Sequence, residues 1–368
     1  MQGSDFATRL RATRSAAGEH GIDAILVTPG PDLTYLVGYE AIPLERLTCL
    51  VIPVDGDPVL VAPRLELLAA QASGAGALGM PIHTWTDTDD PYALVRSIIP
   101  GARRVGLDNH MWAEKVLALR AALPDAEQVL AGGVLSALRM RKGPEEIEAL
   151  VSAGAAIDRV HQRVPGFLRA GRTEREVGAD IAAAILAEGH VTVDFVIVAS
   201  GPNGASPHHE VSDRVIEDGD VVVVDIGGTM PDGYCSDCTR MYAVGSAPDA
   251  FMDGYRVLQA AQQAAVHHAR PGVTCASVDA AARDLLVEAG MGDLFIHRTG
   301  HGIGLETHED PYIVAGNELI LEPGMAFSIE PGFYVEGRYG ARIEDIVIVA
   351  DDGVIVANNG TRELVVAS

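Results

Sequence analysis

The segment VVVVDIGGTMPDGYCSDCTR, residues 221–240, decides how this chain is organised. Its four valines predict a buried strand, PDG at 231–233 is typical of a turn, and residues 234–244 resume an extended pattern. We therefore expect a β-hairpin. With the turn centred on its proline, antiparallel pairing sets Asp225 opposite Asp237, with Cβ atoms about 4.5–5.5 Å apart. Two adjacent carboxylates in an apolar hairpin need a proton, a cation or water to offset their repulsion.

A second hairpin of this kind is expected in SIEPGFYVEGRYGARIEDIVIV, residues 328–349. Glu330 and Glu344 are equally far from Gly337, which lies in a Gly-Arg turn, so they should also be opposed. Between the two hairpins, His301 lies in the ligand-rich segment HRTGHGIGLETHED. Four carboxylates and one imidazole are therefore expected to form one metal-binding cluster.

The charge of this cluster favours two metal ions. The four carboxylates carry −4, whereas one divalent ion returns only +2 and two ions return +4. Oxygen-rich ligation with a single imidazole suits Mn²⁺, Co²⁺ or Mg²⁺ better than a structural zinc ion. Two such ions can activate water for hydrolysis. A single acid at a strand end is usually solvated, so the prediction depends on the joint pattern.

Composition narrows the class of protein. The 368 residues are 48% hydrophobic and 21% charged, which is enough for two domains with cores. The net charge of −24 disfavours nucleic acid and anionic membranes as partners, so small substrates are expected. Residues 1–20 lack the apolar core of a signal peptide, and the longest uncharged stretch is broken by glycines and a proline. A soluble, cytoplasmic protein is expected, and the 4 scattered cysteines suit a reducing compartment.

The pattern predicts two domains, residues 1–135 and residues 136–368. In the first, short strands alternate with helices and there is no dense cluster of acids and histidines, so its expected role is to shape access to the site. The predicted strands are Ala24–Thr28, Leu47–Val54, Pro58–Ala62 and Arg104–Leu107, and the predicted helices are Phe6–His20, Arg64–Gln71, Tyr92–Ile99 and Trp112–Ala122. The basic segment SALRMRKGPEE, residues 136–146, begins the second domain with a helix start at its Gly-Pro pair.

The second domain contains a faint internal duplication. The echoing pairs are GRT at 171–173 with GVT at 272–274, Gly189 with Gly290, His208 with His308, and Asp225 with Glu330. Each half reads helix, helix, histidine and acid hairpin, and Thr173 with Glu176 forms a capping box. Two such halves about a pseudo-two-fold axis would bring both acid hairpins to the midline, with helices over the outer face of a curved antiparallel sheet.

These residues resemble the pita-bread metallopeptidases, a family that includes prolidase, aminopeptidase P and methionine aminopeptidase. The motifs that carry the resemblance are VVVVDIGG, YCSDCTR, HRTGHGIGLETHE, SIEPG and RIED, and the likeness covers nearly the whole chain. It implies an N-terminal α/β creatinase-like domain, a C-terminal α+β pita-bread domain, and a homodimer or larger assembly. It implies that Asp225 binds one metal, Asp237 and Glu344 bridge both, and His301 and Glu330 bind the other. Mn²⁺ or Co²⁺ is favoured, with Zn²⁺ as an alternative.

The resemblance also implies residues on the substrate side. His208, in SPHHE, and His308 match the family's substrate-side histidines, whereas His209 is expected to point the other way on an extended segment. His297 and Tyr334 match positions that line the proline pocket. By the same resemblance Glu330 would also shuttle a proton.

The expected reaction is hydrolysis of the Xaa-Pro bond, which releases the N-terminal residue from small proline-containing peptides. Dipeptides are favoured as substrates, and an Xaa-Pro aminopeptidase that acts on longer peptides is the alternative. A creatinase-type amidinohydrolase and a non-enzymatic peptide-binding relative are disfavoured, because such proteins lack this full ligand set. Methionine aminopeptidase is disfavoured by the N-terminal domain and by Arg342.

A dipeptide also ends in a carboxylate, whose natural partner is a guanidinium group. Arg342 and Arg46 are the candidates. Arg46 follows the Gly-, Pro- and Tyr-containing segment 30–45, which could project into a cleft of its own or of a neighbouring subunit. The alternative is that Arg46 pairs with a surface acid such as Glu45 or Glu40.

Overall fold

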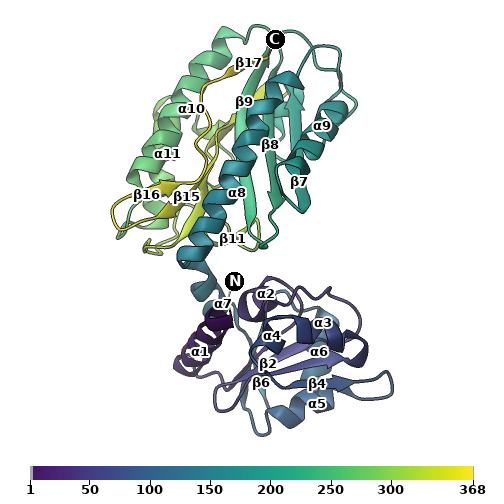
Figure 1. Cartoon of the computed structure of the whole chain (residues 1–368). Coiled ribbons are helices and arrows are strands. Elements are labelled where there is room, and N and C mark those ends of the chain that lie inside the picture. The colour runs from purple at the N-terminus through teal and green to yellow at the C-terminus, as the bar shows by residue number, and fades with distance from the viewer. Residues whose placement is uncertain (1–2, 368) are drawn as a thin grey trace. The chain divides into compact units, whose positions relative to one another are not determined.

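The computed structural model describes residues 3–367, and the chain divides into two compact units, one ending at Arg139 and one beginning at Met140 (Figure 1). They are called the N-terminal unit and the C-terminal unit below. Helix α7, Gly132–Met140, runs across the boundary that the sequence predicts between residues 135 and 136.

The N-terminal unit is built on a six-stranded sheet in the order β4-β3-β2-β1-β5-β6. Strand β1 pairs antiparallel with β2 and parallel with β5, so the sheet is mixed. The strands are β1 (Ala24–Val27), β2 (Cys49–Pro53), β3 (Val59–Pro63), β4 (Ile82–Trp85), β5 (Arg104–Leu107) and β6 (Glu127–Leu130). The helices before α7 are α1 (Gly3–Glu19), α2 (Pro31–Val37), α3 (Leu67–Ala72), α4 (Gly74–Ala77), α5 (Pro91–Ile98) and α6 (Ala113–Ala122).

The predicted strands and helices of this unit are present, with ends that differ by a few residues. The two strands that the sequence did not predict are the outermost ones, β4 and β6. Neither forms a continuous buried run: Glu127 and Leu130 of β6 are exposed, and only Trp85 of β4 is buried. Edge strands with so few buried apolar positions give a weak hydrophobic signal.

The C-terminal unit contains three hydrogen-bonded sheets, in the orders β17-β9-β8-β7, β11-β10-β12-β15-β16 and β13-β14. Their pairings are antiparallel except that β17 runs parallel to β9. The strands are β7 (Thr192–Ser200), β8 (Val221–Thr229), β9 (Cys235–Val244), β10 (Gly300–Gly302), β11 (Glu309–Ile313), β12 (Ala326–Ile329), β13 (Gly332–Val335), β14 (Tyr339–Arg342), β15 (Asp345–Val349), β16 (Val354–Val356) and β17 (Val365–Ala367). The single curved sheet that the sequence predicts is thus divided into three.

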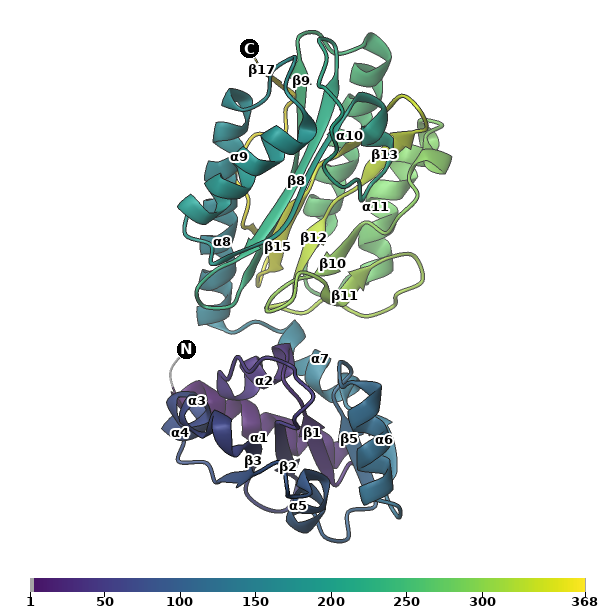
Figure 2. The ribbon, with the colours of Figure 1, turned by 90° about the vertical axis from the view of Figure 1, so that its right-hand side faces the viewer.

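Two pairs of helices cover these sheets (Figure 2). Helices α8 (Pro144–Arg163) and α9 (Glu174–Ala187) pack on β7, β8 and β9, and α10 (Asp249–His268) and α11 (Cys275–Glu288) pack on β12 and β15. Val222 and Val224 of β8 face α8 and α9, whereas Val223 belongs to a different core cluster on the opposite face. Because side chains alternate along a strand, Asp225 shares the face of Val223 and points away from those helices. Within residues 3–367, no helix is long and apolar enough to cross a membrane.

The internal duplication is visible in how the two halves begin. Thr173 and Thr274 each cap a helix by accepting a hydrogen bond from the backbone three residues on, and Thr173 forms the predicted capping box. Gly171 and Gly272 both have a φ near +90°, a value that favours glycine. Both glycines donate to a strand-like segment about 45–50 residues further on, at Ile216 and Leu321. Each acid hairpin is therefore preceded in the chain by the same combination of a capped helix, a glycine with positive φ and a backbone hydrogen bond.

Candidate metal centre

The first acid hairpin is formed by β8 and β9, but its register differs from the prediction. Asp237 lies opposite Gly227, and Asp225 lies opposite Thr239, so the predicted direct pairing of the two aspartates is wrong by two residues. The turn is centred on Asp232 rather than on the proline, because the Asp232 carboxylate accepts a hydrogen bond from the backbone of Tyr234. Asp225 and Asp237 are consequently diagonal neighbours on one face of the sheet, a separation that still allows both to reach one ion.

The second acid hairpin has the predicted register. Gly332 pairs with Arg342, and Ile329 pairs with Asp345, so both pairings are centred on Gly337. Glu330 and Glu344 lie between these two pairings and are therefore opposed, as the sequence predicts.

His301, on the short strand β10, turns its imidazole toward the acids. Its Nε2 lies 3.3 Å from Glu330 Oε1 and 3.6 Å from Asp237 Oδ2. Its Nδ1 lies 3.1 Å from the carbonyl oxygen of Gly302, which fixes the tautomer that leaves Nε2 free for a ligand. Burial and the neighbouring His308 lower the pKa of His301 to about 3, so the ring is neutral and able to bind a metal.

The predicted ligands meet at one place in the fold. Oxygen or nitrogen atoms lie within 4.8 Å of one another in three overlapping groups: Asp225 with Asp237 and Glu344; His301 with Glu330 and Glu344; and Asp237 with His301 and His308. Burial raises the pKa of Asp237, and the nearby charge of Glu344 raises it further. Burial and the charges of Glu330 and Asp225 raise the pKa of Glu344 in the same way. Acids crowded out of water in this manner need a cation.

Arg342 contributes a cation to the cluster that the sequence-based charge count omitted. Its guanidinium is buried and donates to Asp225 Oδ2, to Thr239 Oγ1 at 3.1 Å and to the Tyr334 hydroxyl at 2.8 Å. With one arginine against four acids, the formal charge is −4 + 1 = −3 rather than −4. The prediction of neutrality with two divalent ions is therefore wrong by one charge.

One oxygen atom tests directly whether these residues fit a metal. Asp225 Oδ1 is buried and, among the described residues, has no hydrogen-bond partner, although buried carboxylate oxygens normally have one. Asp225 belongs to the group of possible ligands that includes Asp237 and Glu344. Carboxylate oxygens with one neutral imidazole are the donor set of a hard divalent cation, so the residues fit a metal.

The two predicted substrate-side histidines, His208 and His308, are both exposed, and His308 lies beside His301. His308 is exposed, and its ring centroid is 3.9 Å from that of His301. Although part of the ring reaches solvent, desolvation of the part that packs against the protein lowers the pKa of His308. Nearby Arg298 and His208 lower it further, so His208 is close enough to interact electrostatically with His308. His208 is exposed as well. The extended segment predicted around it is wrong, because the backbone of His209 donates to Ser206 and closes a turn.

His297 and Tyr334, predicted to line a proline pocket, contact each other. His297 Nε2 lies 2.9 Å from the Tyr334 hydroxyl, and Phe295 stands edge-on to the imidazole with ring centroids 5.1 Å apart. Burial lowers the pKa of His297 to about 4, so the imidazole is neutral and can line an apolar pocket.

Arg298 is a candidate site residue that was missed from the sequence. Its Nη2 lies 3.5 Å from His308 Nδ1, and its guanidinium lies over the Tyr312 ring, 4.3 Å from the centroid. Among the ion pairs of the described residues none involves Arg298, although its charge partly offsets the rise that burial causes in the pKa of Glu330. Its place in HRTGHG, three residues before His301, was a usable signal, because it is a cation inside the ligand-rich segment.

Arg46 lies in the N-terminal unit and is held by acids there. Its guanidinium donates to Asp87 at 2.8 Å and to Glu45 at 2.8 Å. The sequence left two possibilities for Arg46, binding the substrate carboxylate or pairing with a surface acid such as Glu45. The structure contains the pair with Glu45.

Known proteins match this chain along almost its whole length. Residues 148–351 match metallopeptidase family M24, and residues 9–141 match the creatinase/prolidase N-terminal domain. PepE of Mycobacterium tuberculosis, a probable dipeptidase, is 55% identical over 362 residues, covering 98% of this chain and 96% of PepE. The Xaa-Pro dipeptidase of Lactobacillus helveticus is 36% identical over 343 residues, covering 90% of this chain and 91% of that enzyme. The crystal structure of dipeptidase PepE from Mycobacterium ulcerans has a TM-score of 0.96 and 54% identity, covering 100% of this chain and 99% of that one.

Proposed function

The chain belongs to metallopeptidase family M24, and on this basis we propose that it uses two divalent metal ions to hydrolyse Xaa-Pro dipeptides. The observation that carries the proposal is the buried acid cluster, which has one internal arginine and an unpartnered Asp225 oxygen among the described residues. The names of two relatives, a probable dipeptidase and an Xaa-Pro dipeptidase, support the choice of substrate.

Asp225, Asp237, His301, Glu330 and Glu344 are the proposed metal ligands. One divalent ion would change the formal charge of the site from −3 to −1, and two would change it to +1. A site with a net positive charge suits the terminal carboxylate of a dipeptide. The ions would polarise the scissile carbonyl and activate water. The oxygen-rich donor set favours Mn²⁺ or Co²⁺, with Zn²⁺ as an alternative.

The proposed work of His208 and His308 is to stabilise the carbonyl oxygen as negative charge develops on it. His308 is held neutral by its lowered pKa, so one of its nitrogens carries an N–H that can donate. Both imidazoles are exposed, and a ring nitrogen of His308 lies within 4.8 Å of ligand atoms of Asp237 and His301.

Glu330 is the proposed proton carrier. The nitrogen of an Xaa-Pro bond has no N–H, so it must accept a proton before proline can leave. In the metal-free chain, burial raises the pKa of Glu330, Arg342 opposes this and Asp225 adds to it, with a result of about 7. As a metal ligand Glu330 would be deprotonated, so it would accept a proton only when released briefly from tight coordination and would then pass it to the proline nitrogen.

The length of the substrate depends on what binds its terminal carboxylate. The donors of Arg342 are engaged by Asp225, Thr239 and Tyr334. Arg46 already pairs with two acids. Arg298 lies beside His308 and is the best-placed partner for a carboxylate just beyond the scissile bond. These contacts favour dipeptides, and an Xaa-Pro aminopeptidase acting on longer peptides is the alternative. In either case a homodimer is the proposed assembly.

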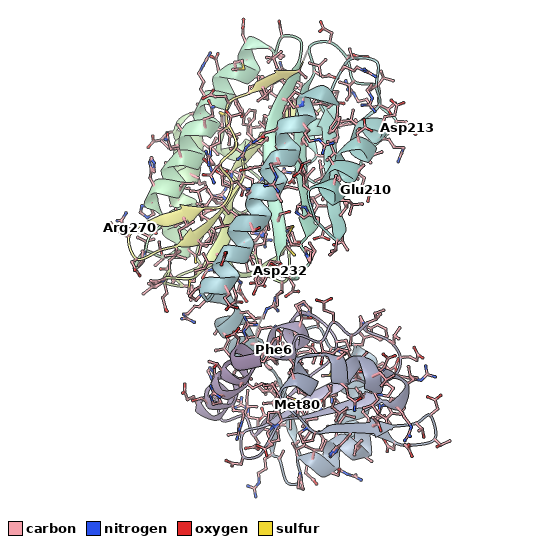
Figure 3. The ribbon with its side chains drawn as sticks, viewed as in Figure 1. Phe6, Met80, Glu210, Asp213, Asp232 and Arg270 are labelled. Atoms are coloured by element: carbon pink, nitrogen blue, oxygen red, sulfur yellow. The ribbon has the colours of Figure 1, made fainter. Side chains whose placement is uncertain are left out.

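This assignment is tested with a panel of Xaa-Pro dipeptides and Xaa-Pro-Xaa tripeptides. Arg298→Ala should raise KM for dipeptides about 10- to 100-fold, because one charge-assisted hydrogen bond is lost, and should leave metal content unchanged. Arg270→Ala is the control, since Arg270 lies at the outer edge of the C-terminal unit (Figure 3) and should not change KM. Efficient cleavage of tripeptides by the parent protein would contradict the dipeptidase assignment. An unchanged KM in Arg298→Ala, with a raised KM in Arg46→Ala, would move the anchor to Arg46.

A further inference from the structure

A fully buried acid outside the metal cluster organises the segment that carries His208. Glu174 is the first residue of α9, and its side chain is 0% exposed. Its carboxylate accepts hydrogen bonds from Ser200 Oγ at 2.7 Å, Asn203 Nδ2 at 3.0 Å, His209 Nε2 at 2.8 Å and Ser212 Oγ at 2.6 Å. One carboxylate thus ties together the end of β7 and the loop that follows it.

The charge of Glu174 is well stabilised. Burial alone would raise its pKa, but the hydrogen bonds from Ser212 and Ser200 lower the pKa of Glu174 to about 2. Its place in the first turn of α9 adds a favourable interaction with the helix dipole. The acid is therefore a permanent anion that can hold a histidine N–H firmly.

His208 lies between two anchored neighbours in the turn that Ser206 and His209 close. On one side, the Pro207 carbonyl oxygen accepts a hydrogen bond from Arg342 Nη2 at 3.4 Å. On the other side, the His209 imidazole is bound by Glu174. The side chain of His209 is only 16% exposed, whereas His208 is exposed. The backbone on both sides of His208 is thereby restrained.

We infer that Glu174 and His209 are a pair of positioning residues that hold the His208 imidazole at the substrate side of the metal centre. The inference rests on the proposed role of His208. A displacement of a donor by about 1 Å can cost about 100-fold in rate, so the restraint matters even though neither residue touches the substrate.

The first test compares two replacements of His209. His209→Leu keeps the bulk but removes the N–H, and kcat for Xaa-Pro dipeptides should fall about 10-fold or more while KM changes less. His209→Gln keeps an N–H that can reach Glu174, and kcat should recover to within about 3-fold of the parent. Glu210→Gln is the matched control, because Glu210 is exposed on the same loop (Figure 3) and should leave kcat unchanged. Metal content and Tm are measured for each variant.

The second test asks whether His209 acts through His208. In a protein that already carries His208→Ala, His209→Leu should lower kcat by no more than about 2-fold. If His209 acts only by positioning His208, removing it has little further effect once the His208 imidazole is gone. Independent, additive losses would overturn the inference, as would full activity of His209→Leu in the otherwise unchanged protein.

A third measurement needs no substrate. In protein labelled with ¹⁵N-histidine, the ring signals of His208, assigned by their absence in His208→Ala, should shift or broaden in His209→Leu and return to the parent positions in His209→Gln. Unchanged His208 signals in His209→Leu would show that His209 does not position His208, whichever reaction the protein catalyses. A parent protein that is inert toward every Xaa-Pro dipeptide would contradict the proposed function instead.

Discussion

Two buried acids next to each other in the sequence, Glu344 and Asp345, lie in opposite electrostatic surroundings. Glu344 accepts one hydrogen bond from Thr239 Oγ1 at 2.8 Å and otherwise faces the acids of the metal cluster. Asp345 accepts hydrogen bonds from Arg240 at 2.7 Å, Gln262 at 2.6 Å and Arg362 at 2.6 Å. Successive residues at the start of a strand point to opposite sides, which is how one step along the chain separates the two regions.

The difference shows how to tell a binding site from a structural ion pair. The cluster around Asp345 contains its own cations, so the folded chain compensates it. The cluster around Glu344 has a single arginine for four acids, and burial together with the neighbouring carboxylates raises the pKa of Asp237 and of Glu344. Such an excess of buried negative charge lowers the stability of the folded chain unless a bound cation compensates it. Uncompensated buried charge of this kind is typical of functional sites. The following predictions test this contrast.

The largest effect is expected from Asp237→Asn. Loss of this proposed metal ligand should lower kcat at least about 10³-fold and reduce the metal content found by calorimetry. The metal-free variant should be no less stable than the metal-free parent, because one of four mutually repelling acids is gone. Asp232→Asn, in the exposed turn of the same hairpin, is the control and should keep its metal, because asparagine retains the oxygen that accepts the hydrogen bond from Tyr234. Full activity with one ion or none would refute the dinuclear proposal.

The opposite result is expected from Asp345→Asn. This change leaves Arg240, whose side chain is 4% exposed, without its carboxylate, and the free energy of unfolding should fall by about 3–5 kcal/mol. Thermal unfolding of the metal-loaded protein measures the effect, with Asp352→Asn at an exposed position as the control. An unchanged Tm would mean that the ion pairs around Asp345 do not stabilise the fold, which would contradict the proposed difference between the two clusters.

The smallest effect concerns pH. Glu330 has an ordinary pKa of 4.5 that burial, with Asp225, raises to about 7 in the folded protein. A raised carboxyl pKa contributes stability that is present below about 4.5 and is lost as pH rises through about 7, on the order of 1 kcal/mol or more. Chelator-treated protein should therefore have a lower Tm at pH 8 than at pH 5.5. Added Mn²⁺ should weaken or reverse the trend, because metal ligands must be deprotonated. If Tm depended on pH in the same way with and without metal, the acids around Glu344 would not be the groups that a metal ion compensates.

Local patterns in the sequence were enough for several features. Hydrophobic alternation and turn residues predicted both acid hairpins, and the opposed position of Glu330 and Glu344 is confirmed by the register around Gly337. The capping box at Thr173 is confirmed as well. These features depend on residues within one or two elements, so their signals are short-range.

Other features became visible only in the folded chain. The register of the first hairpin changed by two residues because an aspartate side chain, and not the proline, centred the turn. Arg342 reaches Asp225 across 117 residues of sequence, and Glu174 reaches His209 across 35. The sequence by itself determined that the two acids of each hairpin lie on one face of their strands, because side-chain alternation is set within each strand. Only the tertiary structure decided which charges meet, because the packing of separate elements sets those distances.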